Sequence, residues 1–250
     1  MLNKDEDKKV DPLVDGDKKE ENKAGAEKMP KVFQNMIDAG VHFGRKKSMS
    51  HPKMKPYVLT VRQNVQILNV EKVAEKLDEA VEFLKGIISG GGTILFVSVS
   101  MPAKYLTKQV AEDLKMPFVF ERWIGGTLTN FKVISKRIEY LLKQEEKKQK
   151  GELAKYTKKE QLDMDKEMED LNRKIGGIKT LKKHPDAIFI VDAGNHDITI
   201  KEATKIGIPV VAVANTNANP SLVQYPIPAN DKSIKSIQYI LDYVRDALSK

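Results

Sequence analysis

Three short, almost uninterrupted apolar runs most constrain how this chain can fold. They occupy residues 93–99, 187–191 and 209–214, and each is shorter than an ordinary globular helix. Strands that are apolar on both sides are typical of parallel sheets covered by helices on both faces. Helical patterns follow these runs. Such alternation of strand and helix predicts a doubly wound parallel sheet with right-handed crossovers.

Four further extended segments are expected. Residues 117–121 read as the next short strand, and residues 225–228 as a short extended piece before the final helix. Residues 57–62 and 65–68 are β-like runs on either side of Gln63 and Asn64, which predicts an antiparallel hairpin. Asn69 and Ser100 stand where caps of the following helices are expected.

Residues 131–182 differ in character from the rest of the chain. Apolar residues recur there at heptad spacing, and Lys and Glu fill most other positions. Gly151 breaks the first helical pattern, and Thr157 with Glu160 forms a capping box that starts the second. We therefore expect an antiparallel coiled-coil helical hairpin, loosely held at its tip, inserted into an α/β domain of residues 31–130 and 183–250. Its apolar seam comprises Ile134, Ile138, Leu141, Met164, Met168, Leu171, Ile175 and Ile178.

The positive charge of the chain is unevenly distributed. The net charge is +8, yet residues 1–30 hold seven Lys against nine Asp or Glu. This N-terminal segment has few apolar residues, so it cannot bury enough surface to offset its ordering entropy, and we expect a disordered tail. The rest of the chain is strongly basic, which indicates a polyanionic partner.

An acid-free window lies between Ala39 and Val70. Pro52 and Pro56 disfavour a helix there, so its positive charges are expected on an extended loop. Basic side chains on irregular backbone bind phosphates, because each contact releases a condensed counterion. The window therefore predicts RNA contact. The candidate RNA-binding residues are Arg45, Lys46, Lys47, Lys53 and Lys55, with Arg62, Arg122 and Lys132 as further candidates.

A strand-to-helix elbow is expected at residues 120–130. Gly125 and Gly126 permit a sharp turn there, and Thr127, Thr129 and Asn130 are residue types that cap helices. Physics alone allows a packed turn without any ligand. Trp123, the only tryptophan, is expected either to cover the base of the helical hairpin near Ile134 and Ile178 or to stack on an RNA base.

An enzyme on the same sheet is the alternative. Ligands of open α/β sheets bind at the carboxyl ends of the strands, where Ser98, Asp192, His196 and Asp197 fall. Asp192, His196 and Asp197 could serve acid–base chemistry or bind a metal. The chain has no glycine-rich phosphate loop after a strand and no nucleophilic serine elbow, so we interpret them as caps and loop braces, with Asp197 as an N-cap. A sugar-phosphate- or nucleotide-binding enzyme stays open, as does an adaptor that acts through the helical hairpin.

Other kinds of site are not expected. The chain has no cysteine, which rules out disulfides, thiolate metal sites and cysteine nucleophiles. His42 and His51 are nine residues apart with no carboxylate between them, which argues against a metal site. No apolar run reaches the length of a membrane span, and the N-terminus lacks a hydrophobic signal core. We therefore expect no catalytic residue, no cofactor, no metal and a cytoplasmic location.

Four motifs, in the right order, resemble the S2 family of bacterial small-subunit ribosomal proteins. The resemblance covers about residues 33–248. The motifs are Ala-Gly-Val-His-Phe-Gly at 39–44, Pro-Lys-Met-Lys-Pro at 52–56, Arg-Trp-Ile-Gly-Gly-Thr-Leu-Thr-Asn at 122–130 and Gly-Ile-Pro-Val-Val at 207–211.

The resemblance implies a flavodoxin-like sheet with an inserted coiled-coil hairpin and a structural role in the small ribosomal subunit. Ribosomal RNA and neighbouring ribosomal proteins are the implied partners, the S1 protein among them. The chain departs from the family pattern at three places. The family usually has His-Gln where this chain has Arg45 and Lys46, Trp-Asn where it has Ser50 and His51, and Asp where it has Asn215.

Overall fold

Five parallel strands form the central sheet of the computed structural model, which describes residues 30–151, 155 and 157–249. The strands are β4 (Ile94–Val97), β5 (Phe118–Val119), β6 (Ala187–Val191), β7 (Val210–Ala214) and β8 (Tyr225–Pro228), in the order β5-β4-β6-β7-β8. Counted along the chain, this is the order 2-1-3-4-5 of flavodoxin-like sheets. The predicted parallel α/β fold is confirmed. Apart from Pro30, the tail expected at residues 1–30 lies outside the described residues.

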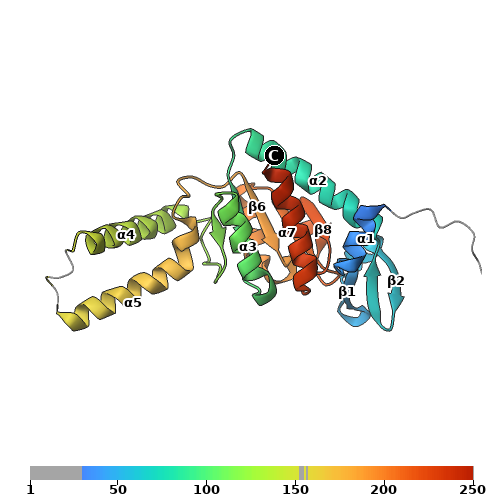
Figure 1. Cartoon of the computed structure of the whole chain (residues 1–250), viewed down its shortest axis with the longest axis horizontal. Helices are drawn as coiled ribbons and strands as arrows, with labels where there is room; N and C mark the ends of the chain where they lie inside the picture. Colours follow the sequence, from blue (N-terminus) through green and yellow to red (C-terminus); the bar gives the residue numbers. More distant parts are fainter. Residues whose placement is uncertain (1–29, 152–154, 156, 250) are drawn as a thin grey trace, which may run out of the picture. The chain divides into compact units, whose positions relative to one another are not determined.

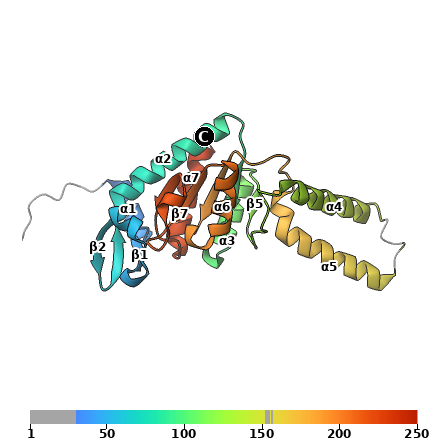
Figure 2. The same cartoon turned by 180° about the vertical axis from the view of Figure 1, so that it is seen from behind.

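Both faces of the sheet are covered, as the apolar runs predict. Side chains alternate along each strand, so Phe96 and Phe189 pack on one face while Leu95 and Ile188 pack on the other. The first face lies under α2 (Val70–Ser89), α3 (Met101–Asp113) and α7 (Ile234–Leu248). The second lies against α6 (Asp197–Ile206), and Figures 1 and 2 show the two sides.

A three-stranded antiparallel sheet precedes the central one. It follows α1 (Lys31–Asp38) and contains β1 (Phe43–Lys46), β2 (Val58–Arg62) and β3 (Val65–Leu68) in the order β1-β3-β2. Gln63 and Asn64 join β2 to β3 with φ angles of 46° and 65°, as a two-residue hairpin turn requires. The hairpin predicted from the sequence is confirmed.

The extended loop predicted for the acid-free window is wrong. After β1 the chain forms two 3₁₀ turns, Lys47–Met49 and Pro52–Tyr57. Pro52 occupies the first position of the second turn, where no backbone N–H is needed. The Nδ1 atom of His51 accepts a hydrogen bond from Lys53 N at 3.2 Å and so caps this turn. The prolines therefore exclude an α-helix but not this tighter form.

Two long helices follow β5. They are α4 (Phe131–Gln149) and α5 (Lys158–Ile175), and a 3₁₀ turn at Gly176–Ile178 comes after α5. Their apolar residues join the second face of the core; Ile134, Ile138, Leu141, Met168, Ile175 and Ile178 are buried. The predicted capping box is confirmed, since Thr157 Oγ1 accepts from Glu160 N and Glu160 Oε2 accepts from Thr157 N.

Charged residues also connect these two helices. Lys148 Nζ lies 2.7 Å from Asp165 Oδ1, and Glu145 Oε1 lies 2.6 Å from Lys179 Nζ just beyond α5. Glu145 and Lys148, the polar residues that α4 offers beyond its apolar seam, therefore each have an ion-pair partner. Exposed ion pairs of this kind contribute only about 0–1 kcal/mol each.

Predictions of helix caps were only partly right. Asn69 caps α2 by accepting from Glu71 N at 2.9 Å. Ser100 and Asn130 occupy N-cap positions without a side-chain cap bond. Asp197 is the first residue of α6 and not its cap, because the carbonyl of His196 already accepts from Ile200 N. No helix in the described ranges is long and apolar enough to cross a bilayer.

One glycine permits a close approach between the helical pair and the sheet. A Cβ atom added to Gly177 would lie 2.2 Å from the carbonyl oxygen of Phe118 in β5. We expect Gly177→Ala to lower the free energy of unfolding by about 3 kcal/mol, because backbone must shift to relieve the overlap. Gly125→Ala is the matched control, since a Cβ there would meet nothing within 4 Å. Equal midpoints for the two variants in denaturant melts would contradict this prediction.

Candidate RNA interface

The acid-free window is fastened to the loops that follow β7 and β8. Thr216, just after β7, accepts from Arg45 N through Oγ1 at 2.9 Å and from His51 N through its carbonyl at 2.7 Å. Asn230, just after β8, donates from its backbone N to the Val41 carbonyl at 3.0 Å. Gly44 is needed here, because a Cβ on it would lie 2.6 Å from Thr216 Cγ2. The window is therefore a fixed part of the fold.

Arg45 makes an internal ion pair. Its Nη2 donates to Asp231 Oδ1 at 2.8 Å, and Asn215 Nδ2 donates to the same oxygen at 2.9 Å. Burial raises the pKa of Asp231, and the nearby charge of Asp192 raises it further, while Asn215 and Arg45 act in the opposite direction. The first predicted RNA-binding residue is thus engaged with the protein's own carboxylate.

The other basic residues of the window are displayed outward. Lys46 ends β1, Lys47 begins the first 3₁₀ turn, Lys53 and Lys55 lie in the second, and Arg62 ends β2. All five are exposed, and none has an ion-pair partner among the residues that the structure describes. Free positive charges on fixed backbone are suited to phosphate contacts, because little side-chain organisation has to be broken first.

Arg122 and Lys132 lie elsewhere. They are exposed residues on either side of the elbow that follows β5. Because β5 and β8 are opposite edges of the sheet, this elbow is separated from the window, which is fastened beside β7 and β8. The structure does not bring these two residues together with the lysines of the window.

Glu202 of α6 organises the elbow, and sequence reasoning missed it. Its Oε1 accepts from Trp123 Nε1 at 3.1 Å and Gly126 N at 2.9 Å. Its Oε2 accepts from Leu128 N at 3.1 Å and from both N and Oγ1 of Thr129 at 3.3 Å. The one signal in the sequence is the position of Glu202 on α6. It lies three residues after Thr199 and next to Ala203, on the face of the helix that is buried, and a buried carboxylate requires hydrogen-bond partners.

These hydrogen bonds determine what the elbow can bind. Burial raises the pKa of Glu202, but the donors of Gly126, Trp123, Leu128 and Thr129 outweigh it, so its pKa lies below the ordinary value. The backbone N–H groups that could bind a phosphate are already bonded to an internal anion. The elbow is thus a structural joint and not a phosphate loop.

Only one of the two glycines in the elbow is needed for its backbone. Gly126 has a φ angle of +88°, which L side chains rarely adopt. Gly125 has no positive φ, and a Cβ there would clash with nothing, so its predicted steric role is wrong. The Thr127 hydroxyl donates to the Ile124 carbonyl at 2.6 Å instead of capping the next helix. The polar groups of the turn are thus bonded to one another or to Glu202 of α6. Asn130 makes no side-chain cap bond to α4.

His196 closes the crevice at the switch point between β4 and β6, where α/β enzymes bind their ligands. Its Nδ1 lies 2.7 Å from the Asp192 carbonyl, and its Nε2 accepts from Val99 N at 3.3 Å. Burial lowers its pKa despite the bond to Asp192, so the imidazole is neutral. Both ring nitrogens are held by backbone. The residue that the enzyme alternative needs as a base is therefore a structural bridge.

Asp192, the buried acid of the crevice, is bonded through one of its two oxygens. Asp192 is buried with a φ angle of 72°, and its Oδ2 meets Asn195 Nδ2 at 2.5 Å and Lys232 Nζ at 3.3 Å. Asp197 is exposed. Within the described part of the chain, no group of three or more His, Asp or Glu side chains is arranged to hold a metal ion.

A flavodoxin-like parallel sheet with an added antiparallel sheet beside exposed basic residues defines a protein of the α/β class. The family model described as "Ribosomal protein S2" matches residues 36–250. A curated relative, "Small ribosomal subunit protein uS2" of Roseiflexus castenholzii (strain DSM 13941 / HLO8), is 42% identical over 212 residues, which is 85% of this chain and 81% of the relative. The chain belongs to the ribosomal protein S2 family, as its four motifs predicted.

The first test at the elbow concerns Glu202. We expect Glu202→Gln to lower the free energy of unfolding by about 3 kcal/mol, because an amide offers one acceptor oxygen and turns its NH₂ toward N–H donors. The folded pKa is depressed, so this carboxylate's stabilisation is present above its unfolded pKa of about 4.3 and is lost as pH falls through the folded pKa. The variant should therefore lose less stability than wild type below that pH. Parallel pH–stability curves would contradict the role of the carboxylate.

The second test concerns Trp123, which is half-buried and packs against the core cluster that contains Ile134 and Ile178. We expect Trp123→Ala to lower the free energy of unfolding of the free protein by about 3 kcal/mol. Trp123→Phe keeps a ring but loses the bond to Glu202, so its free energy of unfolding should lie between those of wild type and Trp123→Ala. Unshifted denaturant midpoints would instead favour stacking of the indole on RNA.

Proposed function

We infer that this chain is a structural constituent of the small ribosomal subunit that binds ribosomal RNA and takes part in translation without chemistry of its own. Membership of the S2 family and the name of its relative support this role. A ribosomal constituent of this kind acts in the cytoplasm. The observation that carries the RNA contact is the set of exposed basic residues on the fastened window that have no ion-pair partner among the described residues.

The proposed main contact is made by the window itself. Lys46, Lys47, Lys53, Lys55 and Arg62 are proposed to meet phosphates directly, since their charges have no competing partner in the described structure. Arg45 is proposed to support this contact indirectly, because its bond to Asp231 holds β1 in place. The positions of Arg122 and Lys132 support a second, smaller contact at the other edge of the sheet.

We further propose that α4 and α5 form the coiled-coil hairpin expected from the sequence, as an insertion of residues 131–182 in the α/β domain. The shared burial of Ile138 and Met168 supports this pairing, as does the ion pair between Lys148 and Asp165. The hairpin and the exposed apolar face near Phe43 and Leu59 offer surfaces to neighbouring ribosomal proteins. The S1 protein is a candidate partner on the strength of the family alone.

The RNA contact is tested by its salt dependence. Five phosphate contacts would give a slope of roughly −3.5 to −4.5 when the logarithm of the association constant is plotted against the logarithm of the salt concentration. Changing Lys46, Lys47 and Lys53 together to Ala should flatten this slope by about two units. Filter binding of small-subunit ribosomal RNA over a series of salt concentrations measures it.

The matched control removes the same charge elsewhere. Lys85, Lys201 and Lys205 are exposed on α2 and α6, outside the window and its anchors, and their joint change to Ala should leave the slope nearly unchanged. If both triple variants flatten the slope equally, binding is a property of the net charge and the window is not the interface.

A further inference from the structure

The outward face of α2 carries the opposite charge from the window. Glu75 lies three residues from Asp78 and four from Glu79, and Glu82 lies four residues from Asp78 and three from Glu79, which places these acids along one stripe of the helix. Asp78 accepts from the Tyr243 hydroxyl at 2.6 Å, and this bond helps raise the pKa of Tyr243 to about 12. An acidic stripe on a chain of net charge +8 repels phosphate, so this face is not suited to RNA.

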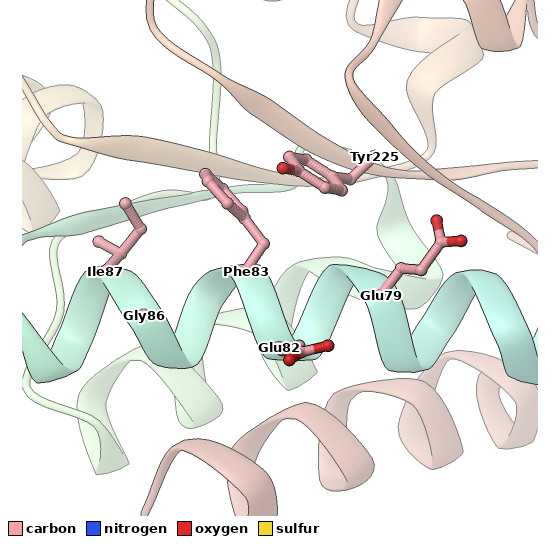
Figure 3. Close-up of a pocket in the computed structure, with 6 residues that line it drawn as sticks. All are labelled: Glu79, Glu82, Phe83, Gly86, Ile87 and Tyr225. Atoms are coloured by element: carbon pink, nitrogen blue, oxygen red, sulfur yellow. The ribbon is translucent and has the colours of Figure 1, made fainter.

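A shallow groove of about 560 Å³ runs beside this stripe, between α2 and the edge strand β8. Its apolar part consists of Phe83, Ile87 and Tyr225, and the rings of Phe83 and Tyr225 stack with their centroids 4.3 Å apart. Figure 3 shows Glu79 beside this aromatic pair, with Glu82 further round the same helix. Aromatic surface and carboxylates therefore meet in one depression.

Gly86 leaves this groove open. It lies inside α2, where glycine weakens a helix relative to alanine, and a Cβ there would meet nothing within 4 Å. Its φ is not positive, so its own backbone does not require glycine. No contact within the described chain explains this residue. The space that it leaves lies in the lining of the groove.

The edge strand beside the groove does not accept another strand. Ala229 N bonds to Ala214 O of β7, and the alternation along β8 then turns Pro226 and Pro228 toward the outer edge. Proline has no N–H to donate, so strand addition is blocked there. A partner in this groove has to bind through side chains.

We propose that this groove binds an arginine-bearing segment of a basic protein partner. A guanidinium is planar, so it can stack on the Phe83–Tyr225 pair while it donates to the carboxylates of Glu79 and Glu82. Glu79 now pairs with Lys76 at 2.7 Å, and both side chains are partly exposed, so this pair exchanges at little cost. The inference concerns a surface separate from the RNA-binding window and does not depend on it.

The test measures binding of a blocked peptide that carries two arginines to the full chain, by isothermal titration at moderate salt. The same peptide with both arginines replaced by citrulline, a neutral analogue of the same shape, is the ligand control. Because the protein is positively charged overall, general electrostatics oppose binding of the arginine peptide, and affinity reports a local acidic site. Equal affinity for the two peptides, or no binding of the arginine peptide, would overturn the proposal.

Paired variants locate the site. Glu79→Gln with Glu82→Gln should weaken the arginine peptide about tenfold, a loss of about 1.4 kcal/mol. Glu139→Gln with Glu167→Gln removes the same charge from exposed positions on α4 and α5 and should change the affinity less than twofold. Equal effects of the two pairs would overturn the assignment to this groove.

Gly86→Leu separates occupancy from stability. Leucine favours the helix, so the variant should melt no lower than wild type, yet its side chain should fill the groove and abolish peptide binding. Unchanged peptide binding would overturn the proposal. Displacement of the peptide by an RNA oligomer, or self-association of wild type that this variant removes, would assign the groove to nucleic acid or to a second copy of the chain instead.

Discussion

The hydrogen bonds of the Glu202 carboxylate are the interaction on which the joint between the sheet and α4 depends. It accepts hydrogen bonds from three backbone N–H groups, the indole N–H and one hydroxyl, all in the elbow between β5 and α4. Hydrogen bonds to a charged acceptor contribute about 1.5–3 kcal/mol each, although such bonds are not additive. Since α6 packs on the sheet, the carboxylate also fixes where α4 begins.

Two other buried polar groups are also bonded within the protein. His196 gives both ring nitrogens to backbone at the switch point, and Asp231 pairs with Arg45. A fold that often holds a small ligand at this crevice here uses its polar residues to fasten loops. What is left for partners lies outside: positive charge on the window and negative charge on α2.

Local patterns in the sequence predicted most of the sheet and its coverings. Runs such as Ile94–Val97 are apolar at every position, and only a strand between two helical layers buries all of them. The turn at Gln63 and Asn64 and the capping box at Thr157 were also readable, because each is decided by residues close in sequence.

The misses are contacts between distant residues. The window was expected to be extended because its prolines were read as helix breakers, while the hydrogen bonds from Thr216 that shape it come from far along the chain. The ion pair of Arg45 was not foreseen, because composition records a charge but not its partner, and Asp231 is 186 residues away. Glu202 was overlooked for the same reason, since its donors lie more than seventy residues earlier.

The fastening of the window has a consequence for the order of synthesis. The chain is made from its N-terminus, so the segment with Lys46, Lys47 and Lys53 emerges early and can pair its own small sheet locally. Its anchors, Thr216 and Asp231, lie 171 and 186 residues further along the chain than Arg45. A nascent chain without them therefore carries the basic residues but not the arrangement that orients them, and the oriented surface arises only after both anchors have been made.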